Sequence, residues 1–236
     1  MSQQPDPTAA PHERTLLAAT VAEEMRTPRA AGVAGVIFGV AIIAVEILIH
    51  LAIPSEGDPA MWIDDATRRG QLSWALTLVP YAGIAFLWFI GVIRSRLGNR
   101  EDRLFATTFL GSGLIFVAML FSSAALLGAL LVLEAGPHPA PVDEVRLFSA
   151  TATLLLTTFG IRMAAVFTLV VTNLGRRTGI VPRWLQVVGY GAALVLLVAP
   201  PRTFWAVVLF PVWVLLLSIQ ILVSGGRPEA AHPAAT

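Results

Sequence analysis

The chain has 236 residues, of which 56% are hydrophobic and 13% are charged, and its mean hydropathy is +0.75. Soluble domains carry about 25% charged residues, so this chain has too little polar surface to cover one water-soluble core. Cysteine is absent and the net charge is +1, which excludes disulfides, thiolate metal sites and an overall field that attracts nucleic acid. We therefore expect a membrane protein whose main partner is the lipid bilayer.

Residues 1–30 are polar and lack the short apolar core and small-residue cleavage site of a secretory signal peptide. Leu17, Val21 and Met25 recur every four residues, so this region is either a short amphipathic helix on the membrane surface or a loose tail. We expect it to be cytoplasmic and partly disordered. Residues 224–236 are expected to form a disordered cytoplasmic tail.

Six apolar blocks follow, and most have about the 20 residues that a bilayer-spanning helix needs. We predict transmembrane helices at residues 31–53, 72–93, 104–133, 147–172, 184–199 and 203–223. The third block is long enough to tilt or to project from the bilayer, and the fifth is short. Pro200 and Pro201 separate the last two blocks and predict a tight hairpin there. The expected fold is an all-α, polytopic bundle of six transmembrane helices.

The arginines are distributed unevenly between the two sides of this bundle. All sixteen basic residues are arginine, and eleven of them fall in the two tails and in the loops after the second and fourth helices. Four fall in the remaining loops: Arg68, Arg69, Arg146 and Arg202. Because cytoplasmic loops are enriched in basic residues, we expect both termini in the cytoplasm. The use of arginine alone, with abundant alanine, glycine and proline, is typical of a GC-rich bacterial genome and predicts the bacterial inner membrane.

Two loops contain clusters of charge. The segment 94–103 is the densest basic cluster and contains Arg94, Arg96, Arg100 and Arg103. This cluster is either a signal for membrane topology or a contact for the phosphates of anionic lipids. The acidic loop 54–71 is interpreted as a solvated loop, with a cation site as the alternative. Met61, Trp62 and Ile63, in the middle of that loop, predict a short segment that rests at the membrane interface.

Two ionisable side chains, Glu46 and Arg162, lie deep in apolar blocks. Each costs about 2.5–3.5 kcal/mol at a helix centre, so each needs a partner or water. Gly35 and Gly39 share a helix face with Glu46 and have the G-x-x-x-G spacing that lets two helices approach closely. Glu46 is therefore expected on a packing face and not toward lipid.

Thr158 and Asn173 lie on the same side of the fourth predicted helix as Arg162. Glu46 and Arg162 differ by roughly 10 Å in predicted depth, a gap that two long side chains or one water can bridge. One interpretation is a charge pair that lines a polar cavity, with His50 as a proton partner, and that binds an anionic head group or relays protons. The other interpretation is a structural pair that fixes which helices touch.

The motifs predict no catalytic, metal or cofactor site. Only one of the four histidines, His50, lies in a membrane block, which excludes a bis-histidine haem within one chain. The H-E-x-x-H pattern of zinc proteases is absent. Ser112 lies between Gly111 and Gly113, a setting that loosely resembles a serine nucleophile turn, but no second membrane histidine supports that role. We interpret the two glycines as packing residues.

Three parts of the chain have a recognisable pattern: residues 162–167, residues 173–185 with Gly189 and Tyr190, and residues 97–103 with 111–113, together 31 residues. In these parts the chain resembles a group of uncharacterised actinobacterial polytopic integral membrane proteins. The resemblance implies a small helical membrane bundle in which Arg162 and Asn173 are motif residues. It implies no activity.

Three functions remain open from the sequence. The leading hypothesis is a non-enzymatic membrane protein that associates with lipid, a membrane protein partner or a second copy, with Glu46 and Arg162 as a structural lock. The main alternative is a small carrier or channel with a polar cavity lined by Glu46, His50, Thr158 and Arg162. An intramembrane enzyme that acts on lipids has the least support, because no acid, base and nucleophile converge.

Overall fold

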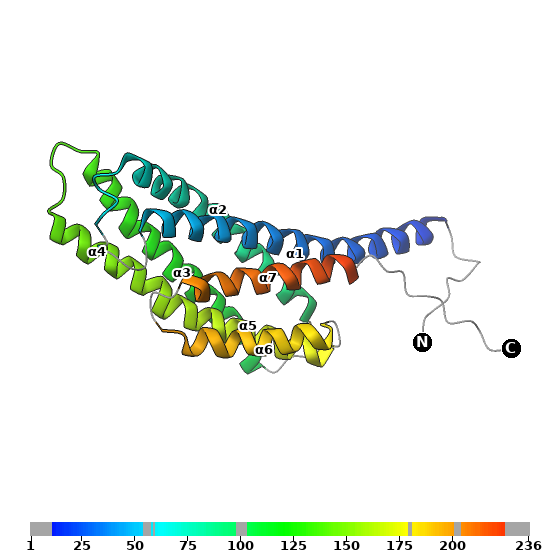
Figure 1. Ribbon diagram of the computed structural model, residues 1–236. Helices are drawn as coiled ribbons and strands as arrows, with labels where there is room; N and C mark the ends of the chain where they lie inside the picture. The colour runs from blue at the N-terminus through cyan, green and yellow to red at the C-terminus, as the bar shows by residue number, and fades with distance from the viewer. Residues whose placement is uncertain are drawn as a thin grey trace.

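The computed structural model describes residues 11–53, 58, 60–97, 103–178, 181–200 and 204–224. Every regular element in these ranges is a helix, and the helices run side by side along one long axis (Figure 1). In chain order they are α1 (Pro11–Ala52), α2 (Ala66–Leu97), α3 (Arg103–Glu134), α4 (Val142–Leu154), η2 (Leu155–Gly160), α5 (Ile161–Thr178), α6 (Arg183–Val198) and α7 (Phe204–Ser224). The prediction of an all-α bundle is confirmed.

Five segments of the described chain are long and apolar enough to cross a membrane. They are Ala30–Ala52, Ala66–Arg94, Ala106–Glu134, Val142–Arg177 and Trp205–Ser224. The remaining predicted span corresponds to α6, which is apolar but has only 16 residues. Its length is about 24 Å, against about 30 Å for the hydrocarbon of a bilayer. The chain is therefore a multi-pass helical membrane protein with five full-length spans and one short apolar helix.

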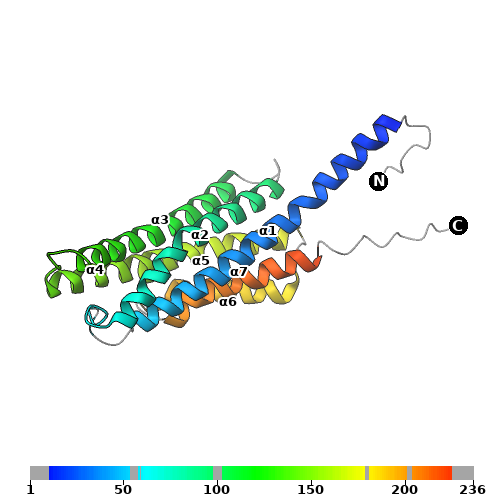
Figure 2. The same ribbon diagram turned by 90° about the horizontal axis from the view of Figure 1, so that it is seen from above.

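The first helix begins well before residue 31, at Pro11. Residues 12–27 contain no glycine or proline and are rich in alanine, glutamate, leucine and arginine, which are strong helix formers. In Figure 2 the start of α1 projects beyond the ends of the other helices. Residues 1–10 and 225–236 lie outside the described residues, so the expectations for those parts of the tails stay predictions.

The fourth predicted helix, 147–172, is longer in the structure and contains a π-helical segment. It starts at Val142 and continues through α4, η2 and α5 to Thr178. After η2, the backbone N–H of Ile161 donates to the carbonyl oxygen of Leu156, five residues back. Such segments occur mostly as single turns within α-helices and are frequent at functional sites.

Seven phenylalanines from five helices fill the centre of the bundle. Their paired ring centroids lie between 4.5 and 6.3 Å apart, in tilted, edge-to-face and stacked arrangements. Aromatic pairs of this kind stabilise a core beyond the area that they bury. We call this cluster the phenylalanine core, and its members are Phe38, Phe86, Phe89, Phe109, Phe116, Phe167 and Phe210.

Small residues bring α1 and α7 together. A Cβ atom on Gly35 would overlap Ser218 of α7, and a Cβ atom on Gly39 would overlap Leu215. Contact positions fall along α7 as they rise along α1, so the two helices are antiparallel. This close approach is the kind that G-x-x-x-G spacing allows. α1 also packs along α2, and Phe89 of α2 reaches the same glycine, Gly35.

A second apolar cluster covers the end of the bundle where α1 stops and α2 starts. We call it the Trp62 cap, and its members are Ala52, Ile53, Ala60, Trp62, Leu72, Leu127, Leu130, Val145 and Ala152. Trp62 is fully buried, and its Nε1 donates to Ser149 Oγ at 3.4 Å. The Trp62 ring is covered by protein, whereas Met61 beside it is exposed, and the position of this segment at the membrane interface stays a prediction. The ring fills the space between the ends of α2, α3 and α4, where its large apolar area is covered.

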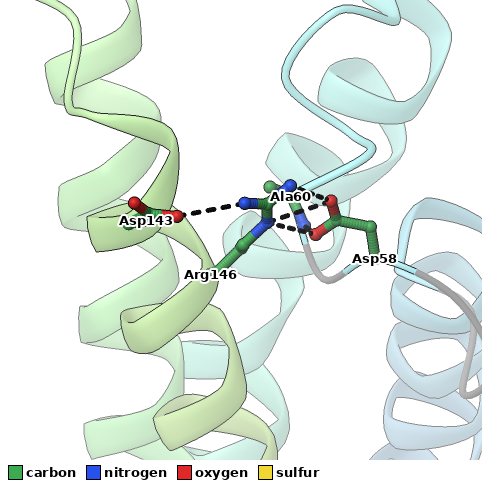
Figure 3. Close-up of polar contacts among 4 residues, drawn as sticks. All are labelled: Asp58, Ala60, Asp143 and Arg146. Carbon is green, nitrogen blue, oxygen red and sulfur yellow. Dashed lines mark hydrogen bonds and ion pairs between the residues drawn. The ribbon is translucent and has the colours of Figure 1, made fainter.

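Charged side chains fasten the Trp62 cap to α4 and to α1. The guanidinium of Arg146 lies between two carboxylates (Figure 3): it donates to Asp58 at 2.6–3.1 Å and to Asp143 at 3.0 Å. Arg68 donates to the carbonyl oxygens of the last two residues of α1, at 3.1 and 3.2 Å. These carbonyls have no partner within the helix, so Arg68 satisfies the C-terminal end of α1.

Candidate polar site in the membrane-spanning helices

Glu46 lies in the seam between α1 and α7. Its side chain is 6% exposed and lies on the helix face that carries Gly35 and Gly39. The antiparallel register that places Gly39 against Leu215 continues outward along α1, so Glu46, two turns further on, lies opposite the first turns of α7. Glu46 forms no ion pair and no side-chain hydrogen bond with any residue that the structure describes.

Arg162 lies at the start of α5, directly after η2. Its Nη1 donates to the carbonyl oxygen of Thr157 at 3.1 Å, and its Nη2 donates to that of Ala199 at 2.9 Å. Thr157 belongs to η2 and Ala199 follows α6, so one guanidinium joins the π-helical segment to the C-terminal end of α6. The side chain is half-buried. Carbonyl oxygens satisfy N–H donors but leave the positive charge without a counter-charge.

The ion pair between Glu46 and Arg162 that the sequence suggested does not form. Neither residue belongs to an ion pair within the described ranges, and the described hydrogen bonds of Arg162 go to carbonyl oxygens. The physical reason lies in the helix packing. α1 packs against α2 and α7, whereas α5 packs mainly against α3 and α6, so the two charged residues lie on helices that do not pack along each other.

The remaining predicted site residues are distributed along the bundle. His50 is half-buried, one turn beyond Glu46 on α1. The hydroxyl of Thr158 is buried in η2 and has no hydrogen-bond partner within the described part of the chain. Asn173 is half-buried about three turns beyond Arg162 on α5. Ser112 is buried and donates to two backbone carbonyl oxygens of its own helix.

Sequence reasoning missed a second group of buried polar atoms, between α5, α6 and α7. Thr172 Oγ1 and Trp213 Nε1 are both buried without a hydrogen-bond partner among the residues that the structure describes. Both atoms crowd the place where a Cβ atom on Gly189 would stand. A glycine at a helix contact allows weak Cα–H···O contacts and close packing. The signal in the sequence is the isolated pair Gly189 and Gly191 within an apolar helix, although only the first of them makes this contact.

Exposed arginines gather at the end of the bundle opposite the Trp62 cap. Arg94 is exposed near the end of α2, and Arg176 and Arg177 are exposed near the end of α5. The other predicted contacts for lipid phosphates lie outside the described side chains: Arg96, Arg100 and Arg103.

Hydrogen bonds determine the titration of the carboxylates at the Trp62 cap. The side-chain hydrogen bond from Arg146 is the main cause that lowers the pKa of Asp58, and the backbone N–H of Ala60 lowers it further. Backbone N–H groups at the start of α2, with that of Arg68 first, lower the pKa of Asp65. Both carboxylates are therefore ionised and hydrogen-bonded at neutral pH.

Comparisons with models of known protein families, with curated proteins and with solved structures found no match. The resemblance to actinobacterial membrane proteins therefore stays a prediction. The case for a function rests on the residues of this chain alone.

Proposed function

We propose that the protein is a small carrier that takes up and releases a proton at Glu46 as it moves a solute across the membrane. The observation that carries this proposal is the burial of Glu46 in a membrane-spanning helix without a partner among the described residues. An ionised carboxylate at a helix centre costs about 2.5–3.5 kcal/mol on insertion scales, and a bound proton removes that charge. Acidic side chains in such positions commonly mark proton or ion pathways.

A purely structural role for Glu46 has weaker support. A structural lock needs a partner, and Arg162 donates to the carbonyl oxygens beside it instead. An apolar side chain of similar volume would fill the seam between α1 and α7 without bringing a charge into it. The same residue therefore fits the carrier hypothesis better than the lock.

Apolar groups on both sides of Glu46 support a carrier over an open channel. Phe38 of the phenylalanine core lies about two turns before Glu46 on α1, and Ile53 of the Trp62 cap lies about two turns after it. A channel needs a continuous wet path in its open state. A carrier, by contrast, passes through states in which its midplane site is closed to one side or to both.

We infer that the end with the exposed arginines faces the cytoplasm. Arg94, Arg176 and Arg177 lie at the end where α7 stops, and the Trp62 cap lies at the opposite end (Figure 1). Basic residues are enriched on the cytoplasmic side of membrane proteins. In this orientation the Trp62 cap faces the outside, and Glu46 lies in the outer half of the bundle.

The test is proton movement in vesicles that contain the purified chain and a trapped pH-sensitive dye. Glu46→Gln keeps the shape of the side chain but cannot titrate, and we expect it to abolish the dye response to a solute gradient. Glu144→Gln makes the same change at an exposed site at the start of α4 and serves as the matched control. An unchanged response in Glu46→Gln, or no response from the parent chain with any solute tried, contradicts the proposal.

A second candidate function, association with lipid or with a protein partner, is favoured by one face of α2. Trp74, Tyr81 and Trp88 follow each other at intervals of seven residues, and they are 68%, 65% and 71% exposed. Tyrosine and tryptophan prefer the membrane interfaces, yet Tyr81 lies near the middle of its span. Replacing Tyr81 by Phe and measuring the oligomeric state in vesicles by cross-linking tests whether its hydroxyl meets a partner.

A further inference from the structure

We propose that Arg162 binds a small monovalent anion that travels together with the proton on Glu46. The inference rests on the proposed function and names the class of solute. The observation behind it is that the two membrane charges of this bundle do not neutralise each other, as described above. Each group is therefore open to an external counter-charge: a proton for the carboxylate, and an anion for the guanidinium.

The hydrogen-bond geometry of Arg162 leaves donors for such an anion. A guanidinium has five N–H donors in a planar fork, and the described hydrogen bonds to Thr157 and Ala199 use one on Nη1 and one on Nη2. Three N–H groups remain, and two oxygens of a carboxylate or phosphate match such a fork in a bidentate arrangement. The half-buried state of the side chain keeps part of it accessible.

Arg162 lies beside the C-terminal end of the short helix α6. Its partner Ala199 directly follows α6, which is too short to cross the full hydrocarbon layer. The helix made of α4, η2 and α5 continues well past that point (Figure 1). Arg162 therefore lies at the level where α6 has ended but its own helix has not, and its half-buried side chain is not fully enclosed by the residues that the structure describes.

The charge balance of transport also favours an anion. Without solute, the ionised Glu46 and Arg162 together carry no net charge. With a proton on Glu46 and a monovalent anion on Arg162, the sum is again zero. Because moving net charge across the membrane depends on the membrane potential, a cycle between these two states is independent of that potential. Transport of a proton alone, or of a proton with a cation, would move net charge and would depend on the membrane potential.

The experiment uses the full chain in phosphatidylcholine vesicles with a trapped pH dye and imposed gradients of lactate or inorganic phosphate. Choline chloride provides the baseline, and protein-free vesicles correct for leak. We expect internal acidification with lactate or phosphate, at a rate that does not change when potassium and valinomycin set the membrane potential. Arg162→Lys keeps the charge but loses the fork, and we expect it to raise the KM for the anion several-fold with a smaller effect on the maximal rate.

Arg162→Gln should abolish the anion-dependent acidification, while Arg146→Gln, the same change at an exposed arginine beside the Trp62 cap, should not. If proton movement depends on Glu46 but is insensitive to the anion and to Arg162→Lys, the carrier proposal stands and this inference fails. If the parent chain moves no protons under any gradient, the proposed function itself fails. Acidification that appears only when anionic phosphatidylglycerol replaces phosphatidylcholine would show that Arg162 binds a lipid headgroup. This result would contradict a soluble anion as its ligand.

Discussion

Arg162 shows that backbone carbonyls can hold a guanidinium inside a membrane bundle without an ion pair to any acid that the structure describes. The last carbonyls of a helix have no partner within that helix. The end of α6 supplies such a carbonyl at Ala199, and η2 supplies a second at Thr157. Arg68 uses the same device at the end of α1. Both arginines therefore donate hydrogen bonds to carbonyl oxygens at the C-terminal ends of helices. Glu46 is not the partner of either arginine.

The lack of contact between Glu46 and Arg162 predicts additive mutations. Arg162→Leu removes the side-chain donor to the carbonyl oxygens of Thr157 and Ala199, and we expect a cost of about 1–3 kcal/mol in the free energy of unfolding. Glu46→Leu removes an unpartnered acid, and we expect a neutral or stabilising effect. The double variant should equal the sum of the two within about 0.5 kcal/mol. Unfolding of the parent, the two single variants and the double variant in detergent measures the coupling energy between the two residues. A large favourable coupling energy would show that Glu46 and Arg162 do form an ion pair.

Gly189 gives a second prediction at this scale. A methyl group there would overlap Thr172 and crowd Trp213, so Gly189→Ala should lower the free energy of unfolding by about 1–3 kcal/mol. Gly191 lies two residues further along the same helix, and no atom lies within 4 Å of the position that its Cβ atom would take. Gly191→Ala is therefore the control, and it should be neutral or slightly stabilising because alanine is the better helix former. Equal losses for both variants would contradict the packing assigned to Gly189.

At the level of elements, the sequence predicts helices well and their neighbours poorly. An apolar run of membrane length is a strong signal, because no other structure satisfies the backbone in lipid. The π-helical turn at Leu155–Gly160 leaves no such signal, since one extra residue in a turn changes neither the length nor the apolar character of the run. The burial of Trp62 depends on Ser149 and Val145, which are far away in the sequence. The residue pattern of α1 also does not show which neighbouring helix Glu46 faces.

The Trp62 cap gives a prediction about stability. Replacing a fully buried tryptophan by alanine commonly costs about 3–5 kcal/mol, so Trp62→Ala should strongly destabilise the end of the bundle. Trp74 is 68% exposed and close by on α2, so Trp74→Ala is the matched control in detergent. Unfolding followed by circular dichroism distinguishes them. A similar loss for both would show that the Trp62 ring is not an anchor.

Asp58 should make the attachment of the Trp62 cap sensitive to acid. Its folded pKa lies below its unfolded value of about 3.9, so its pair with Arg146 contributes stability above that pH. The contribution is lost as the pH falls through the lower, folded pKa. The unfolding midpoint should therefore drop between pH 5 and pH 2 by more in the parent than in Asp58→Asn. Asp64→Asn, on an exposed neighbour, should keep the drop of the parent.

At the scale of the whole molecule, the helices divide into two groups. α1, α2 and α7 pack closely with one another through α1, while α3, α4, η2, α5 and α6 pack around α3 and α5. Glu46 belongs to the first group and Arg162 to the second. The phenylalanine core, the α2–α3 contact and the α6–α7 contact join the groups. A carrier that rocks one group against the other would change the distance between these two charges in every cycle.

The shortness of α6 has a consequence for the surrounding lipid. A 16-residue helix reaches about 24 Å, so the acyl chains beside it must shorten or tilt by several ångströms to keep its ends wetted. The bilayer is thus thinner beside α6 and keeps its usual thickness beside the longer helices. Vesicles made from lipids with shorter tails should therefore raise the thermal stability of the reconstituted chain, and longer tails should drive copies to cluster along that flank.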